Sequence, residues 1–178
     1  MSQLHLNMSR PVASFPEMGV RGVIDLRAYA VDAAATGDWL TGRATPAFAD
    51  DRASVVAFAP VGEGRVEALP DDEFLILLSG TLTVERARGV TIITTGRCAV
   101  LPAGLSFGWR APAGTIAIVV TCPAAAGAAE DIVPIDEAAS LQQSNPPIAD
   151  LLIGPTPSCR NHSDYQSTNG ELTCGTWD

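Results

Sequence analysis

The sequence predicts an all-β fold, an antiparallel sandwich or barrel, and three observations support this prediction. Residues 71–109 hold short runs rich in Val, Ile, Leu and Thr, which favour strands. Glycine or proline separates these runs at short intervals, as Gly80, Gly96 and Pro102 do. No segment between these breakers is long enough for an ordinary helix. The stretch 71–109 therefore organises the predicted fold.

The first strand is expected at residues 22–30, where two sets of side chains alternate. Residues 31–53 contain several Gly, Pro and Asp residues and predict a loop with one helical turn. Gly-Glu-Gly at residues 62–64 predicts a tight turn. The other strands that we expect lie at residues 54–59, 65–69, 74–78, 81–85, 90–94, 98–101, 107–109 and 115–121.

The character of the chain changes after Pro123. Residues 124–170 are first Ala-rich and then polar with several prolines, which predicts an irregular connection with a short helix at residues 136–143. Residues 171–178 alternate like a strand, for which we expect no hairpin partner. The Ser/Thr/Asn-rich part also contains a Cys/His/Asp set without an apolar frame, which we interpret as irregular linker: Cys159, His162, Asp164 and Tyr165.

A weak internal repeat links the two ends of the sequence. Leu40–Pro60 and Leu152–Asp178 share a Leu-x-Gly, a proline, a polar loop and a strand, in that order. The repeat predicts that the last strand opens a second copy of the unit.

Composition excludes several classes of function. The 178 residues can bury one sizeable core, and the formal charge of −9 disfavours nucleic acid and anionic membranes as partners. All eleven basic residues are Arg, so Schiff-base chemistry and a phosphate-loop lysine are excluded. His5 and His162 both lie outside the strand-rich centre, which excludes a Ser–His or Cys–His pair built inside a barrel.

The cysteines indicate a reducing compartment. Cys98, Cys122, Cys159 and Cys174 form no CxxC and no zinc spacing, and the first two are expected as buried free thiols. No signal peptide is recognisable, and the apolar stretch Ile116–Ala129 is interrupted before it could span a membrane. We expect a cytoplasmic protein.

Two spaced motifs resemble those of the cupin superfamily. Glu73-x6-Gly80 resembles the end of the first cupin motif, and Gly96-x5-Pro102-x-Gly104 resembles the second. The phrases DDEFLILLSGTLTV and PAGLSFGW are similar to the small cupin family that includes ureidoglycine aminohydrolase and ethanolamine-utilisation cupins. The terminal CGTWD resembles the opening strand of such a unit in two-cupin proteins.

This resemblance covers residues 54–121 and implies an RmlC-like antiparallel jelly-roll barrel with an irregular C-terminal extension. The implied organisation is an N-terminal arm at 1–20, a cupin barrel at 21–122, a linker at 123–170 and a strand at 171–178 that resembles the start of a second cupin unit.

The departures from the family pattern concern the metal ligands. A metal-binding cupin carries two His before the Glu and one His after the Pro-x-Gly. Here the first two positions fall among Ala68, Leu69 and Pro70, and the third falls at Phe107. Glu73 alone cannot hold Mn, Fe or Zn against water, so we expect no metal and no cofactor.

Glu73 is the single catalytic candidate. In the cupin register it points into the barrel beside Leu75, where it would act as an acid/base or a polar anchor; alternatively it belongs to a solvated Asp-Asp-Glu turn. Phe107 and Trp109 share one face and form either the wall of a ligand pocket or core. Arg65 either pairs with Glu73, holds a ligand carboxylate, or lies on a solvated strand face. Together these five are the predicted ligand-binding residues.

The resemblance and its departures predict a metal-free cupin domain that binds a small organic ligand or serves as the structural, dimerising half of a two-cupin protein. The alternative is an enzyme of the ureidoglycine-aminohydrolase-like group, with catalysis in a second, metal-bearing cupin rather than in this chain. A homodimer is expected because both faces of Phe74–Leu78 are apolar.

Overall fold

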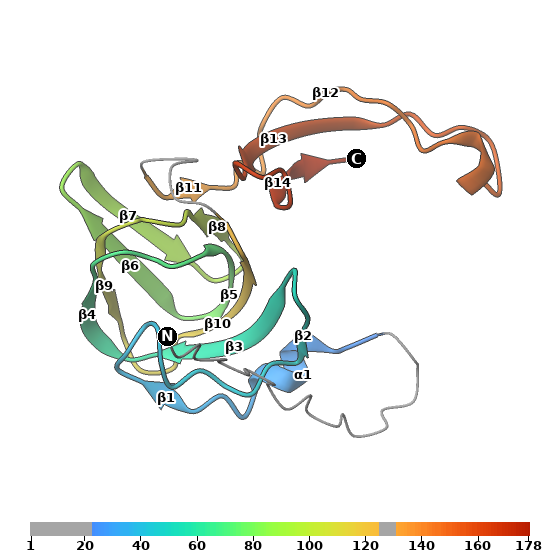
Figure 1. Cartoon of the computed structure of the whole chain (residues 1–178). Helices are drawn as coiled ribbons and strands as arrows, with labels where there is room; N and C mark the ends of the chain where they lie inside the picture. The colour runs from blue at the N-terminus through green and yellow to red at the C-terminus, as the bar shows by residue number, and fades with distance from the viewer. Residues whose placement is uncertain (1–22, 125–130) are drawn as a thin grey trace, which may run out of the picture.

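The computed structural model describes residues 23–124 and 131–178, and strands make up most of its regular structure (Figure 1). The all-β prediction is confirmed. Two sheets pack face to face into a cupin-like jelly-roll barrel, and a third, smaller sheet lies in the C-terminal extension. The N-terminal arm predicted at residues 1–20 lies outside the described residues.

The larger barrel sheet has the strand order β1-β3-β10-β5-β8-β11, with β2 paired to β3. Its pairs are antiparallel except β1–β3, which is parallel. Its strands are β1 (Ala35–Thr36), β2 (Phe48–Ala49), β3 (Ser54–Pro60), β5 (Asp72–Ser79), β8 (Cys98–Leu101), β10 (Ile116–Cys122) and β11 (Val133–Pro134).

The smaller barrel sheet has the order β4-β9-β6-β7. It comprises β4 (Gly62–Val66), β6 (Thr81–Arg86), β7 (Gly89–Thr94) and β9 (Phe107–Ala111). The extension adds β12 (Gln142–Gln143), β13 (Arg160–Gln166), β14 (Thr173–Trp177) and the short 3-10 helix η1 (Ala149–Leu151).

Two local predictions for the chain ahead of β5 are wrong. Residues 26–30 form a helix, α1 (Leu26–Ala30), instead of a strand, because the Asp25 carboxylate caps it by accepting hydrogen bonds from the backbone N–H groups of Arg27 and Ala28. Residues 62–64 lie in strand β4 instead of a tight turn. Gly64 is needed there for packing, since an added Cβ would lie 2.8 Å from Nε1 of Trp109.

The predictions for the C-terminal extension are also partly wrong. The helix expected at 136–143 is a turn followed by β12. Residues 160–166 form a strand instead of irregular linker, and β13 pairs antiparallel with β14, so the terminal strand does have a hairpin partner. His162, Asp164 and Tyr165 therefore belong to a strand.

The core lies between the two barrel sheets. Inward-facing side chains of β5, β6 and β9 fill it, and they include Leu75, Leu77, Leu82, Val84, Phe107 and Trp109.

The outer face of β5 is covered within the chain. Phe74 packs against Tyr165 and Cys174 of the C-terminal hairpin, and Ile76 and Leu78 pack against a cluster that includes α1 residues. The apolar outer face that led us to expect a homodimer is thus occupied, and the dimer itself stays a prediction. In the part of the chain that the structure describes, no helix has both the length and the apolar character to cross a membrane.

Candidate functional site

Glu73 points into the barrel, as the cupin register predicts. It is the second residue of β5, and its neighbours on the inner face are Leu75 and Leu77. Only 3% of Glu73 is exposed, so the interpretation as part of a solvated turn is wrong. A carboxylate this deep in an apolar core requires partners, because an unpaired buried charge is very costly.

Trp39 and Arg43 provide these partners. The indole Nε1–H of Trp39 donates to Oε2 of Glu73 at 2.9 Å. The Arg43 guanidinium binds both carboxylate oxygens, with Nη1 at 2.8 Å from Oε1 and Nη2 at 3.1 Å from Oε2. Nε of Arg43 also donates to the backbone carbonyl of Trp39 at 2.9 Å. Both oxygens of Glu73 are therefore engaged by strong donors.

Trp39 and Arg43 also pack against the aromatic side chains of the barrel interior. The Trp39 ring meets Phe58 and Phe107 edge-on, each with ring centroids 5.0 Å apart, and lies 5.9 Å from Trp109. The guanidinium of Arg43 lies 4.9 Å from the centroid of Phe58. Phe107, Trp109 and Leu75, predicted as either pocket wall or core, belong to the core cluster.

Residues 38–43, which carry Trp39 and Arg43, form what we call the plug segment. Oδ1 of Asp38 accepts hydrogen bonds from the backbone N–H groups of Leu40 and Thr41 at 2.8 and 2.9 Å, and these bonds hold the pKa of Asp38 below its usual value. Gly42 adopts a positive φ of 71°, which only glycine reaches easily. This tight local structure turns Trp39 into the barrel.

The plug segment was missed from the sequence. It lies in the stretch predicted as loop, where neither Trp39 nor Arg43 belongs to a periodic pattern. The one available signal was the tryptophan itself, since such a large apolar side chain in a polar loop is usually buried against something.

The residues around Glu73 do not fit a metal ion. Leu69 and Phe107, at positions where the family motif carries histidine, are buried apolar side chains. Trp39 and Arg43 present hydrogen-bond donors to Glu73 and offer no lone pair to a metal. The described residues contain no group of three or more His, Cys, Asp or Glu side chains placed to hold a metal ion.

Arg65 lies outside this cluster. It does not pair with Glu73; its Nε donates to Glu67 at 2.9 Å and its Nη2 donates to Ser106 at 3.1 Å. The side chain is 62% exposed, which agrees with the interpretation as a solvated strand face.

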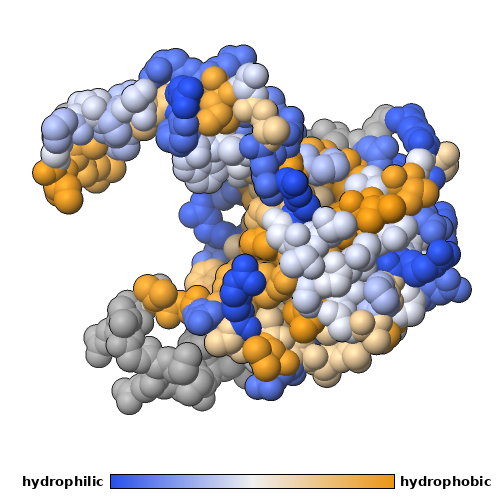
Figure 2. All heavy atoms as spheres, turned by 180° about the vertical axis from the view of Figure 1, so that it is seen from behind, coloured by the Kyte–Doolittle hydropathy of each residue, from blue (hydrophilic) through white to orange (hydrophobic). Residues whose placement is uncertain are grey.

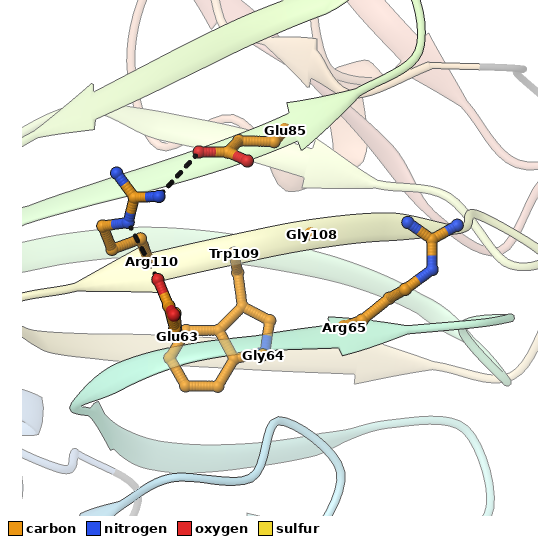
Figure 3. Close-up of a pocket in the computed structure, with 7 residues that line it drawn as sticks. All are labelled: Glu63, Gly64, Arg65, Glu85, Gly108, Trp109 and Arg110. Atoms are coloured by element: carbon orange, nitrogen blue, oxygen red, sulfur yellow. Dashed lines mark hydrogen bonds and ion pairs between the residues drawn. The ribbon is translucent and has the colours of Figure 1, made fainter.

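Arg65 borders a shallow groove of about 410 Å³ on the outer face of the smaller sheet (Figure 3). Gly108 has no side chain, and its cross-strand neighbours are Arg65 on one side and Glu85 on the other. Arg110 lies 3.3 Å from Glu63 and 3.5 Å from Glu85. The charges of the groove thus satisfy one another in a solvated setting, where such pairs are weak.

Asp72 is a second buried carboxylate, to which sequence analysis assigned no role. It is fully buried, and its oxygens accept hydrogen bonds from the backbone N–H of Ala103 at 2.8 Å and from the hydroxyl of Tyr165 at 2.7 Å. Burial, and then the bond to Asp72, raise the pKa of Tyr165 above its usual value. Asp72 therefore fastens the C-terminal hairpin to the barrel.

Comparison with known proteins supports the fold. No family model matches the sequence, and no curated protein matches it. A protein of unknown function from Pseudomonas syringae pv. tomato, assigned to the DUF861 family, shares 26% identity with a TM-score of 0.68 over 74% of this chain and 57% of its own. The present chain thus spans little more than half of that protein.

Two further solved structures are similar at lower scores. A cupin-2 domain protein from Shewanella frigidimarina shares 18% identity at a TM-score of 0.40, over 44% of this chain and 78% of its own. An RmlC-like cupin from Desulfovibrio desulfuricans shares 16% identity at a TM-score of 0.36, over the same shares of the two chains. The chain is an all-β protein with a cupin-like fold.

Proposed function

We propose that this chain is a metal-free cupin domain that serves as the structural half of a two-cupin protein. One observation carries the proposal: Trp39 and Arg43 occupy the barrel interior and engage both oxygens of Glu73. A barrel closed in this way holds its own side chains where a ligand would lie.

The same contacts argue against catalysis by Glu73. A general base must present a free lone pair to a substrate proton. The lone pairs of Glu73 instead face a guanidinium and an indole within an aromatic core. We therefore assign Glu73 the role of anchor for the plug segment.

The two-cupin part of the proposal rests on the C-terminal extension. The repeat predicted from the sequence ends in β13–β14, and these strands form an antiparallel hairpin, as β2–β3 do at the start of the barrel. In an enzyme of the ureidoglycine-aminohydrolase-like group, catalysis would accordingly belong to the second unit. The four cysteines are unpaired, which fits the cytoplasmic setting that we propose.

A small organic ligand, if one binds this domain, would meet the outer groove. Arg65 and Arg110 present guanidinium groups there on either side of Gly108 (Figure 3). A ligand carboxylate would have to replace the exposed ion pairs of the groove, and we expect it to bind with only modest affinity.

The proposal is tested by incubating the protein with metal ions and by screening it against small ligands. Purified protein is incubated with Mn, Fe or Zn, dialysed, and assayed for metal; we expect far less than one equivalent. Thermal-shift screening with small organic acids should reveal no ligand that raises Tm by binding in the barrel interior. One retained equivalent of metal would overturn the proposal, as would a ligand whose binding is lost in Leu75→Ala but kept in Arg65→Met.

A further inference from the structure

The extension carries an apolar segment that lies away from the described barrel strands (Figure 1). Residues 148–154, which we call the tip segment, lie at the far end of an arm that reaches away from the barrel (Figure 1). Ile148, Leu151 and Ile153 are all highly exposed there. Figure 2 shows this apolar group in orange at the end of the arm. Apolar side chains that are exposed together in this way make the tip segment a candidate interaction surface.

The hairpins that follow the plug segment and the tip segment match in register. β2–β3 pairs Ala49 with Ser54, and β13–β14 pairs Gln166 with Thr173. Four residues further along the second strand of each hairpin stands an aromatic residue. In the first hairpin this is Phe58, which is buried against Trp39. In the second it is Trp177, which is 73% exposed.

The segments that precede these hairpins also match. Three of five positions, the first, third and fifth, are identical between the plug segment and the tip segment, namely Asp38-Trp39-Leu40-Thr41-Gly42 against Asp150-Leu151-Leu152-Ile153-Gly154. Leu151 takes the position of Trp39 in this alignment. The two exposed side chains Leu151 and Trp177 thus correspond to the buried pair Trp39 and Phe58.

We propose that the tip segment is the plug of a second cupin barrel that begins with β14. Within it, Leu151 would pack against Trp177 as Trp39 packs against Phe58. This inference rests on the proposed two-cupin function, and it assigns the arm one partner, a barrel of the same fold. Cys174 already faces the first barrel, packed with Val100, so Trp177, three residues along the strand, faces the opposite way, toward a second core.

The two plugs differ in charge. Arg43 follows Gly42 in the plug segment and neutralises Glu73, whereas the residues between Gly154 and Pro157 include no arginine. The tip segment would therefore close a second barrel by apolar contact alone. An acidic or metal-binding centre in that barrel would stay free of a competing guanidinium.

The test uses a two-unit protein, the full chain followed by a second copy of residues 60–122, so that Asp178 takes the position of Ala59 and β14 stands in the place of β3. Glu73 of the copy is replaced by Leu because the tip segment has no counterpart of Arg43. Hydrogen exchange of residues 150–154 should slow by about tenfold or more relative to the 178-residue chain once they are buried.

The matched variants are Leu151→Asp and Val31→Asp, since both side chains are apolar and about equally exposed, at 71% and 73%. In the 178-residue chain, neither should change Tm. In the two-unit protein, Leu151→Asp should lower Tm of the second unit by about 5 °C or more, and Val31→Asp should not. Equal effects, or a folded second unit with fast exchange at 150–154, would overturn the plug but leave the two-cupin proposal standing.

Failure of the copied unit to fold on β14 would count against the two-cupin proposal itself. A second variant then still tests the plug. The substitutions Trp39→Leu/Thr41→Ile/Arg43→Pro give residues 38–43 the sequence of residues 150–155, and Glu73→Leu removes the charge that Arg43 had neutralised. We expect cooperative unfolding and nuclear Overhauser contacts between the methyl groups introduced at position 39 and the ring of Phe58. A molten or aggregated product would overturn the inference.

Discussion

Asp72 and Glu73 are consecutive residues at the start of β5, and their side chains enter two different environments. Glu73 faces the barrel interior, where a cation and an indole from the plug segment bind it. Asp72 faces the outer side of the same sheet, where a backbone amide and the hydroxyl of Tyr165 bind it. Both carboxylates are buried, yet one is paired with a charge and the other with neutral donors.

The difference shows how one strand serves both ends of the chain. Successive side chains of a strand point to opposite faces, so neighbouring acids can hold unrelated segments. Glu73 holds a segment that precedes the barrel strands, and Asp72 holds one that follows them. An acidic cluster at a strand entry, which resembles a solvated turn or a catalytic group, is here a pair of structural anchors.

The largest expected effect comes from breaking the inner pair. Arg43→Met removes the only cation that contacts Glu73 among the described residues, and leaves a buried carboxylate with Trp39 alone. The free energy of unfolding should fall by about 3–5 kcal/mol, the usual cost of an uncompensated buried charge. Urea unfolding followed by tryptophan fluorescence measures it.

Two comparisons sharpen this prediction. Arg65→Met breaks an exposed pair and should change stability by less than about 0.5 kcal/mol. Arg43→Met/Glu73→Leu removes both charges and should recover most of the loss, because a well-packed apolar pair is often as stable as a buried ion pair. A double variant no more stable than Arg43→Met would show that Glu73 is not the reason for the loss.

A smaller effect is expected on the outer side. Asp72→Ala leaves the N–H of Ala103 and the hydroxyl of Tyr165 without their acceptor, which should cost about 2–3 kcal/mol. The loss should be concentrated in the hairpin, so hydrogen exchange in β13 and β14 should speed up more than in β10. Asp71→Ala, one residue away and not fully buried, is the control and should leave exchange in the hairpin unchanged.

The inner side of this comparison was more predictable from sequence than the outer side. Motif spacing set the orientation of Glu73, and alternation put Phe107 and Trp109 on one inward face, since these signals lie within single strands. Trp39 and Tyr165 could not be assigned in this way. Each meets β5 only after a long loop, more than thirty residues away from Glu73 for Trp39 and more than ninety from Asp72 for Tyr165.

Within the hairpin, β14 was predicted as a strand, but β13 was mistaken for linker because its side chains are polar. β13 carries His162, Asp164 and Gln166, and it gains its stability from pairing with β14 and from Tyr165 rather than from an apolar face. A period-two pattern of hydrophobic residues, the main sequence signal of a strand, is therefore missing.

The smallest expected effect is a loss of stability at alkaline pH on the outer side, where Asp72 binds Tyr165. Burial, followed by the hydrogen bond to Asp72, raises the pKa of Tyr165 above its usual value of 10.0, and burial raises that of Cys174 from 9.0 to about 12. A group that holds its proton more tightly when folded stabilises the fold fully below its unfolded pKa. That contribution declines as the pH rises above 9 for Cys174 and above 10 for Tyr165, so the hairpin should loosen on the alkaline side.

An ultraviolet titration of wild type minus Tyr165→Phe reports the ionisation of Tyr165 alone. Its midpoint should lie well above 10.0 in the folded protein. Wild type should also lose more stability than Tyr165→Phe between about pH 9 and 11 in urea unfolding, because only wild type must keep the phenol protonated in its native contact. Asp72→Ala removes the hydrogen bond and the negative charge that Asp72 contributes to the raised pKa of Tyr165, and should shift the midpoint down without reaching 10.0, since burial is the largest cause. A wild-type midpoint at 10.0 would mean that Tyr165 is not held against Asp72, and the outer anchor would lose its main contact.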